Sequence, residues 1–374
     1  MDQTVELVRH WAAQGIAGEW GDLPDIQPAV IIEVLEAEGV LPLVFEALNE
    51  RGASMPPEGI SGNLIDRLRT RYQLAAVRDL MQETSLKERL PALAGNGVAS
   101  LLIKGAGLCR WLYPKSFLRP RSDIDVLISP EMVDRAIQHF LGAGYQVTPT
   151  CLGRYMTHQF SAWKQNAADK LVTFDVHRAA SNSLLIAEAL PNHLLNTGSI
   201  PVDGLPGVSR LGAWQSLALA CLHLAAGREH PRLIWLYDIF LLVKTLSQDE
   251  VREFWRWASE TEMLQVCVYF VRLALDYFPV KLDHHDWGSL YASFGDKPIE
   301  LSAILLNTSV SYNDLRRLDL KSLPSLSQKL GYVSEFLFPP VAYMRERYGL
   351  ERQGAAALAA AYIKRLFGNN LTAG

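Results

Sequence analysis

The chain has 374 residues, with 36 lysines and arginines against 40 aspartates and glutamates and a formal net charge of −4. Its 49% of hydrophobic and 20% of charged residues exclude an intrinsically disordered chain, and its length predicts two or three domains of ordinary size. The slightly negative charge argues against a protein that binds nucleic acid mainly through bulk positive charge.

Cysteine spacing and apolar runs indicate the compartment. The four cysteines lie at least 42 residues apart, so no pair has the spacing of a metal site, and four in a chain of this length do not form a disulfide scaffold. The first residues carry acids and lack the apolar run of a secretory signal. The most apolar run, 211–227, is interrupted by polar residues, and its apolar stretches are shorter than the ~20 residues of a membrane span. We therefore expect a cytoplasmic protein with reduced, buried thiols.

Helical periodicity marks both ends of the chain. Residues 1–95 predict an N-terminal helical region and residues 206–374 a C-terminal helical domain, because apolar residues recur three and four positions apart. The clearest predicted helices are 64–93, 214–226, 233–246 and 354–367. Pro56, Pro57 and Gly59 indicate a loop in the first region, and Pro339-Pro340 a break between helices in the last.

The central zone, 96–205, changes period. Its short apolar or alternating runs predict strands at 99–103, 123–128, 145–150, 159–164 and 171–177. A helix is predicted at 108–113, and a second after Ser129-Pro130, which supply an N-cap and a first-turn proline, up to the stop at Gly142 and Gly144. Strand, helix, strand, helix and further strands predict a small α/β core, so that the whole chain is α+β with flanking helical regions.

The run SDIDVLI, residues 122–128, carries the sharpest local chemistry. Side chains i and i+2 of a strand point to the same face, so Asp123 and Asp125 project together. Two adjacent carboxylates repel each other unless a cation lies between them or one is protonated. Paired carboxylate oxygens, with positions left open for phosphates, are the ligands that Mg²⁺ uses in phosphoryl chemistry. The alternative is a strand that begins at the solvent edge, with both aspartates facing water.

Two further segments bear on this choice. Residues 101–107 form a strand that enters a glycine turn ahead of the helix, whose free backbone N–H groups suit a phosphate. Asp175 is a lone acid inside an apolar strand, where a carboxylate is costly unless it is paired or bound to metal. Taken alone, Asp175 could equally pair with a neighbouring arginine. Taken with Asp123 and Asp125, it makes a three-carboxylate metal site the better account.

These segments together resemble a known family. A strand, glycine turn and helix, then two aspartates on the next strand and a third on a later strand, is the pattern of the DNA polymerase beta-like nucleotidyltransferase superfamily. The residues that resemble its bacterial uncharacterised nucleotidyltransferase family are Lys104-Gly105-Ala106, the run RPRSDIDVLI at 119–128, Gly144-Tyr145 and FDVH at 174–177. Similar motifs continue with His223, Arg232-Leu233, Trp235, Asp238-Ile239, Pro339 and Arg347-Tyr348. The resemblance covers the chain from about residue 25 onward.

The resemblance implies a polymerase-beta-like core and a metal-dependent nucleotidyltransferase. Such an enzyme transfers a nucleoside monophosphate from a nucleoside triphosphate to an acceptor hydroxyl and releases pyrophosphate. Asp123 and Asp125 would hold Mg²⁺ or Mn²⁺ on the triphosphate, and Asp175 would complete a second metal site or act as the base on the acceptor hydroxyl. The acceptor stays open between a small molecule, a protein and an RNA end, and no membrane partner is expected.

The resemblance also indicates binding residues. The candidates for nucleotide binding are Lys104, Gly105, Ala106, Arg119, Arg121 and Ser122. The candidates for contacting the acceptor or supporting the aspartates are His177, His223, Arg232 and Asp238, for which hydrogen bonds within the fold are the alternative. Ala106 departs from the superfamily turn, which usually has glycine or serine there. The departure removes a hydroxyl contact to phosphate, for which Lys104, Arg119 or Arg121 could compensate.

Three other interpretations can be weighed. The run GAGLCR at 105–110 nearly matches a dinucleotide-binding glycine motif, but Arg110 replaces its third glycine and prolines follow. Residues 284–286, His-His-Asp, are metal-binding types, yet adjacent histidines on a loop diverge, so no metal site is expected there. A non-catalytic nucleotide-sensing or partner-binding module on the same fold is a further alternative. The three aspartates argue against it, while Ala106 and the lack of an obvious acceptor site leave it open.

Overall fold

The core of the molecule is one mixed β-sheet. The computed structural model describes residues 2–50, 60–148, 153–165, 171–227, 230–278, 299–307, 309–350 and 353–367. In this part of the chain seven strands lie in the order β3-β4-β5-β2-β1-β7-β6. The strands are β1 (Ser100–Leu102), β2 (Ile124–Leu127), β3 (Gln146–Val147), β4 (Gln159–Gln165), β5 (Leu171–His177), β6 (Ile200–Pro201) and β7 (Val208–Arg210). The β2–β5 and β1–β7 pairs are parallel, and the other neighbours are antiparallel.

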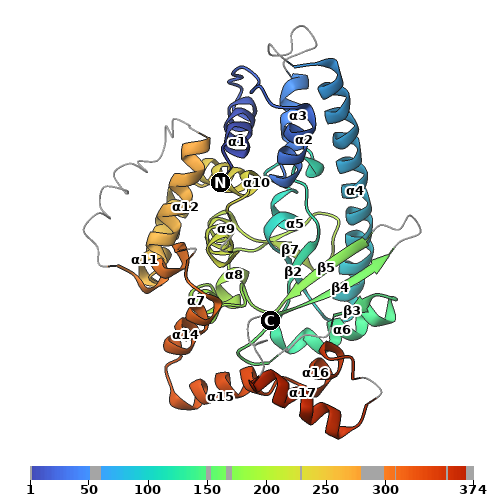
Figure 1. Cartoon of the computed structure of the whole chain (residues 1–374), viewed down its shortest axis with the longest axis vertical. Coiled ribbons are helices and arrows are strands. Elements are labelled where there is room, and N and C mark those ends of the chain that lie inside the picture. The colour runs from blue at the N-terminus through green and yellow to red at the C-terminus, as the bar shows by residue number, and fades with distance from the viewer. Residues whose placement is uncertain are drawn as a thin grey trace.

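Helices precede the sheet at the N-terminal end. They are α1 (Gln3–Ile16), α2 (Pro28–Ala37), α3 (Leu41–Glu50) and α4 (Gly62–Gly95). The hydroxyl of Ser61 caps α4 by accepting a hydrogen bond from the backbone N–H of Leu64. Figure 1 shows α1–α3 together at one end of the molecule and α4 running from there along the side of the sheet. Helix α4 contacts β5 and β7, so it joins the N-terminal helices to the core.

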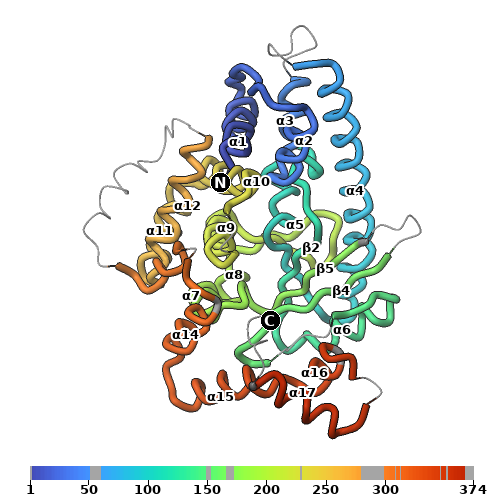
Figure 2. The backbone as a smooth tube through the Cα atoms, viewed as in Figure 1, coloured from blue at the N-terminus to red at the C-terminus, as the bar shows by residue number. Residues whose placement is uncertain are grey.

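Short helices connect the strands, and a helical region follows them. The connecting helices are α5 (Lys104–Leu108), α6 (Val133–Gly142), α7 (Leu184–Ala189) and α8 (Asn192–Asn196). The following helices are α9 (Ala213–Gly227), α10 (Leu233–Thr245), α11 (Gln248–Glu260), α12 (Leu264–Tyr277), α14 (Tyr312–Ser322), α15 (Leu326–Leu337), α16 (Val341–Arg347) and α17 (Ala355–Phe367). The tube in Figure 2 shows the red C-terminal segment, α14–α17, at the end of the molecule opposite α1–α3. Helical regions at both ends and a mixed sheet between them confirm the α+β class.

The period-2 alternation of the strands separates two apolar cores. In β2, Ile124 and Val126 belong to a core that also holds Phe140 of α6 and three leucines of α4. Leu127, on the other face, belongs to a larger core built from the N-terminal helices and α9–α12. Side chains at odd positions of β2 therefore face the α9–α12 side of the sheet. This assignment matters because Asp125 is one of them.

Most predicted elements are confirmed, and one is wrong. The strand at 171–177 and the helices at 64–93, 214–226, 233–246 and 354–367 are present with boundaries within two or three residues. The helix predicted at 108–113 is wrong: α5 begins at Lys104 and ends at Leu108, and turns follow. The left-handed φ of +48° at Lys104 turns the chain straight from β1 into the helix. Pro114 disfavours helical backbone at Tyr113, where the predicted helix was to end. The domain boundaries after residues 95 and 205 stay a prediction.

Cysteine burial and helix hydropathy agree with the composition. Cys109, Cys221 and Cys267 are free and buried, as predicted, while Cys151 lies outside the described residues. Residues 51–59, with the predicted proline loop, and residues 284–286 also lie outside them. No described helix is both long enough and apolar enough to cross a bilayer. The cytoplasmic location stays a prediction.

Candidate active site

The predicted aspartates meet on the α9–α12 face of the sheet. The parallel register of β2 and β5 pairs Asp125 directly with Asp175, so their carboxylates project side by side from the same face. Asp123 lies in the bend just before β2 and is partly buried. Two carboxylates from neighbouring strands and a third from the bend before β2 thus lie near one another, although 52 positions separate Asp123 from Asp175 in the sequence.

Asp125 has two nitrogen partners. The Nζ atom of Lys104 lies 2.8 Å from Oδ1 of Asp125, and Nε2 of His177 lies 2.9 Å from the same oxygen. Lys104 Nζ is also 3.5 Å from His177 Nε2. The two nitrogen-bearing side chains come from the start of α5 and the end of β5, on either side of the acid. The structure therefore joins three of the predicted site residues in one cluster, in which a single carboxylate oxygen is shared.

Asp175 has a partner that the sequence did not reveal. Ser161 lies opposite Asp175 in the antiparallel β4–β5 pair, and its hydroxyl donates a 2.5 Å hydrogen bond to Oδ1 of Asp175. This bond leaves the second carboxylate oxygen of Asp175 for other contacts and fixes the rotation of the carboxylate. The alternation of β4, in which Phe160 and Ala162 are buried and Ser161 is not, was the available signal, but it does not show which strand lies beside β4.

Electrostatics divides the aspartates into two kinds. Burial, together with the negative charges of Asp125 and Asp175, raises the pKa of Asp123 to about 6. Burial alone would also raise the pKa of Asp125, but the charge of Lys104 and the hydrogen bond of His177 outweigh it and hold that pKa well below its usual range. Asp125 is therefore ionised at neutral pH, whereas burial and the neighbouring negative charges oppose the ionisation of Asp123.

The glycine turn is shaped by close packing. A Cβ on Gly105 would lie 2.7 Å from Nη1 of Arg119, and one on Gly107 would lie 2.9 Å from the carbonyl oxygen of Leu102. The first glycine thus admits a guanidinium against α5, and the second lets α5 approach β1. The methyl group of Ala106 is buried in the core that contains α6. A serine hydroxyl at this position would lie among apolar side chains, so the departure from the superfamily turn suits this core.

Arg119 is held by the C-terminal helical region. Its guanidinium makes a two-pronged ion pair with Asp238 of α10, with Nε 3.1 Å and Nη2 2.7 Å from Oδ2. The hydroxyl of Tyr113 donates to the other oxygen of Asp238 at 2.7 Å. Arg119 and Asp238 are both almost fully buried. The contact joins the loop before β2 to α10, and it gives both predicted residues a structural partner.

Arg121 is held by α4. Its guanidinium pairs with Asp79 at 2.7 Å and with Glu83 at 2.8 Å, and its side chain is only 2% exposed. Glu83 also pairs with Arg110, so four charged side chains form a network between α4 and the loop. Exposed Ser122 follows, and its hydrogen bond with Asp123 lowers the pKa of that acid slightly against the larger raising effects. Nucleotide binding by Arg119, Arg121 and Ser122 stays a prediction. In the structure both arginines are paired with carboxylates of the protein.

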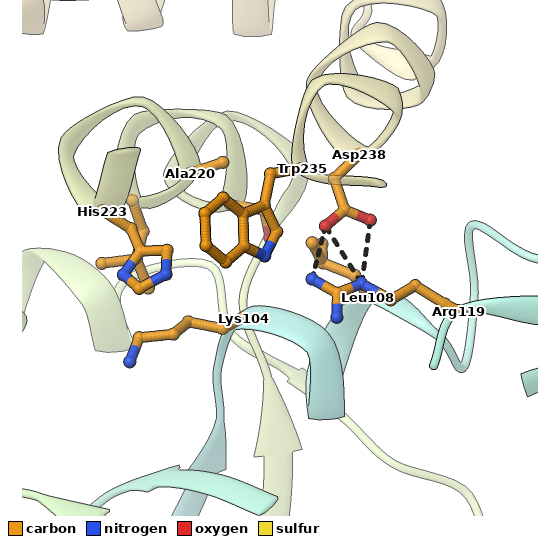
Figure 3. A pocket seen from close by; sticks show the side chains of 9 residues that line it. Lys104, Leu108, Arg119, Ala220, His223, Trp235 and Asp238 are labelled. Carbon is orange, nitrogen blue, oxygen red and sulfur yellow. Dashed lines mark hydrogen bonds and ion pairs between the residues drawn. The ribbon is translucent and has the colours of Figure 1, made fainter. Parts of the chain in front are cut away.

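His223 lines a small cavity beside Lys104. Its ring packs edge-to-face on Trp235, with 5.5 Å between ring centroids. Desolvation and the nearby charge of Lys104 lower the pKa of His223 to about 3, so its imidazole is neutral. Figure 3 shows Lys104, His223 and Trp235 around the cavity, with the Arg119–Asp238 pair beside them. The cavity volume of about 20 Å³ suits one water molecule and is far below that of a nucleoside.

Arg232 contacts the N-terminal helices. Its Nε donates to the carbonyl oxygen of Ala37 at 2.6 Å, and its guanidinium lies over the ring of Trp235 at 5.4 Å. The side chain thus satisfies a carbonyl at the C-terminal end of α2. Among the predicted support residues, the structure therefore brings His177 and His223 to Lys104 and ties Arg232 and Asp238 into contacts between helices.

The donor set fits a divalent cation in chemistry and in charge. Three carboxylates supply the hard oxygen ligands that Mg²⁺ and Mn²⁺ prefer. Burial first, and then the negative charges of Asp125 and Asp175, raise the pKa of Asp123. In the part of the chain described, no group of three or more acidic, histidine or cysteine side chains has the geometry of a metal site. One oxygen of Asp125 accepts contacts from Lys104 and His177, and one oxygen of Asp175 accepts the hydrogen bond of Ser161.

The chain was compared with protein families and with curated proteins. Residues 24–279, about two thirds of the chain, match a family model described as an uncharacterised nucleotidyltransferase. This range includes the sheet, the three aspartates and helices α9–α12. No curated protein matches the chain significantly.

Proposed function

The chain belongs to the uncharacterised nucleotidyltransferase family, and from that premise we propose a reaction. The protein transfers a nucleoside monophosphate from a nucleoside triphosphate to an acceptor hydroxyl. The hydroxyl oxygen forms a bond to the α-phosphorus, the bond between that phosphorus and the α–β bridging oxygen breaks, and pyrophosphate leaves with the electron pair. The observation that carries the proposal is the side-by-side placement of Asp125 and Asp175 on parallel strands, with Asp123 beside them.

The aspartates are proposed to bind Mg²⁺ or Mn²⁺. Asp123 and Asp125 would hold the ion, and Asp175 would contribute from the neighbouring strand. When bound, such an ion offsets the negative charge that develops on the transferred phosphoryl group and on the pyrophosphate. The pKa of Asp123 is raised by burial and, beyond that, by the charges of Asp125 and Asp175, and a divalent cation would offset that repulsion.

Asp175 is proposed to receive the proton of the acceptor hydroxyl. The hydrogen bond from Ser161 occupies one of its oxygens, which leaves the other oxygen to accept a proton. Ser161 is thus a positioning residue that sets the orientation of the base. His177 acts in the same way on Asp125, since its Nε2 lies 2.9 Å from the carboxylate oxygen Oδ1.

Lys104 is the proposed phosphate ligand of the glycine turn. Its ammonium contacts the carboxylate cluster, whereas the guanidinium groups of Arg119 and Arg121 are held by acidic side chains of α10 and α4. We assign these arginines to positioning the loop that leads into Asp123. Their substitution should therefore affect folding more than nucleotide affinity.

A thermal-shift panel tests the proposal. Wild type and Asp123→Asn are heated with ATP, GTP, CTP or UTP, each with and without Mg²⁺. Ligand at 100 times its dissociation constant stabilises the folded state by about 2.7 kcal/mol, which gives a clear shift. We expect a Mg²⁺-dependent shift for at least one nucleotide in wild type and its loss in Asp123→Asn. Asp134→Asn, at an exposed acid in the first turn of α6, is the matched control and should behave as wild type. The absence of a shift with all four nucleotides would refute the proposal.

A non-catalytic nucleotide-sensing module is the second candidate. The ion pair between Lys104 and Asp125 favours it, because a carboxylate with a permanent internal partner has less need of a metal. The two candidates differ in turnover. A nucleotide that binds without Mg²⁺ and never yields pyrophosphate, with acceptors screened from small molecules to RNA ends, would support the sensing module.

A further inference from the structure

The negative charge of the aspartate cluster is partly neutralised from within the chain. Among the described residues, Lys104 is the one lysine or arginine in an ion pair with Asp123, Asp125 or Asp175. Its Nζ lies 2.8 Å from Oδ1 of Asp125, within the range of a charge-assisted hydrogen bond. The ammonium therefore lies against an oxygen that a divalent cation would need.

The backbone beneath this side chain is firmly fixed. Lys104 has a φ of +48°, a left-handed conformation that is unfavourable for a residue with a Cβ. Gly105 packs against Arg119, which is itself tied to α10, and Gly107 packs against the carbonyl of Leu102. Such a conformation persists only where its surroundings hold it in place. The turn therefore holds the lysine stem at the edge of the cluster while the flexible side chain remains free to change rotamer.

A small cavity lies beside the Lys104 side chain. The cavity lined by Lys104, His223 and Trp235 has a volume of about 20 Å³, close to the size of one water molecule or one ammonium group. The Lys104 side chain is 19% exposed, so it also reaches solvent and any phosphate bound there. A lysine has a flexible four-carbon stem, so a change of rotamer can turn the ammonium from Asp125 toward a phosphate while the backbone keeps its place.

From these observations we propose that Lys104 is a built-in cation that occupies one cation position of the carboxylate site in the nucleotide-free protein. A divalent ion gains full access to Asp125 only when the ammonium moves away, and the triphosphate attracts the ammonium as it arrives. The metal and the nucleotide are consequently bound together rather than the metal alone. This inference rests on the proposed function and adds that the metal binds with the nucleotide rather than before it.

The test measures Mn²⁺ binding to the full chain without nucleotide. Free Mn²⁺ is titrated by electron paramagnetic resonance against wild type, Lys104→Met and Lys104→Arg. We expect Lys104→Met to bind Mn²⁺ more than about tenfold tighter than wild type, because removing a positive charge in contact with a shared carboxylate removes its repulsion of the metal. Lys104→Arg keeps the charge and should keep the weak affinity. Mn²⁺ alone should also raise the melting temperature of Lys104→Met more than that of wild type.

The matched control is Lys115→Met. Lys115 also forms an ion pair with one acid, Glu46, at 2.5 Å, but away from the aspartates. This variant should bind Mn²⁺ as wild type does. Equal Mn²⁺ affinity in Lys104→Met and wild type would overturn the inference, and if Lys104→Met does not fold, Lys104→Gln gives the same test. The inference fails alone when Mg²⁺-dependent nucleotide binding is present and the Mn²⁺ gain is absent, while the proposed function fails alone when the opposite holds.

Discussion

The Arg119–Asp238 ion pair allows a stringent test of how the site is supported. Asp238→Asn keeps the shape of the side chain but leaves the buried guanidinium without a counter-charge. Both side chains are less than 10% exposed, and the pair has two short contacts. Breaking one partner of a buried pair costs about 3–5 kcal/mol, because the remaining charge stays desolvated. The hydrogen bond that Tyr113 donates to Asp238 is weakened as well, so we expect a loss in the upper part of that range.

The assay is equilibrium urea unfolding, followed by tryptophan fluorescence and far-UV circular dichroism. Coincident transitions justify a two-state free energy. Arg119→Met combined with Asp238→Leu removes both charges, and we expect it to recover most of the stability lost in Asp238→Asn, since apolar replacement of a buried pair is often close to neutral. Glu253→Gln, which breaks an exposed pair on α11, is the control and should change the free energy of unfolding by less than about 0.5 kcal/mol. A loss below about 1 kcal/mol in Asp238→Asn would refute the reasoning and return Arg119 to the group of possible phosphate ligands.

Three further predictions concern one hydrogen bond, one glycine and one buried histidine. Ser161→Ala removes the hydrogen bond that orients the proposed base, so we expect kcat to fall about tenfold with KM little changed and the melting temperature nearly constant; an unchanged kcat would remove Ser161 from the site. Gly105→Ala places a Cβ 2.7 Å from a fixed guanidinium nitrogen and should destabilise the fold by about 1–3 kcal/mol, whereas Gly142→Ala, with open space around it in α6, should be neutral or stabilising; equal effects in urea unfolding would contradict the packing argument. Burial and the charge of Arg178 lower the pKa of His158 to about 4, so the unfolded chain takes up a proton first as the pH falls below about 6.5. The folded state should lose up to about 3 kcal/mol between pH 6.5 and pH 4, and His158→Gln should flatten this part of the profile.

The sequence alone determined most of the local elements, although it misplaced the short helix after β1. The β5 strand has the predicted boundaries because its alternation of apolar and polar residues matches the period of a strand. The long helices of both terminal regions follow from apolar residues three and four positions apart. The sequence also showed that Asp175 lies inside an apolar strand, where a carboxylate is unusual whichever strand lies beside it. Three candidate site residues, Asp123, Asp125 and Asp175, could thus be named before the fold was known.

The tertiary structure decided which side chains meet. Asp125 pairs with Asp175 because β2 and β5 are parallel neighbours, although β3 and β4 separate them in the chain. Arg119 binds an acid 119 positions away, on α10, and Arg121 binds acids about 40 positions earlier, on α4. An ion pair depends on distance in space and on burial, and neither is encoded in the local pattern that predicts a helix or a strand. For that reason the sequence identifies the charged groups around this site but not their partners. Only the packing of α4, α5 and α10 against the sheet shows that Arg119 and Arg121 pair with acids of helices and that Lys104 pairs with Asp125.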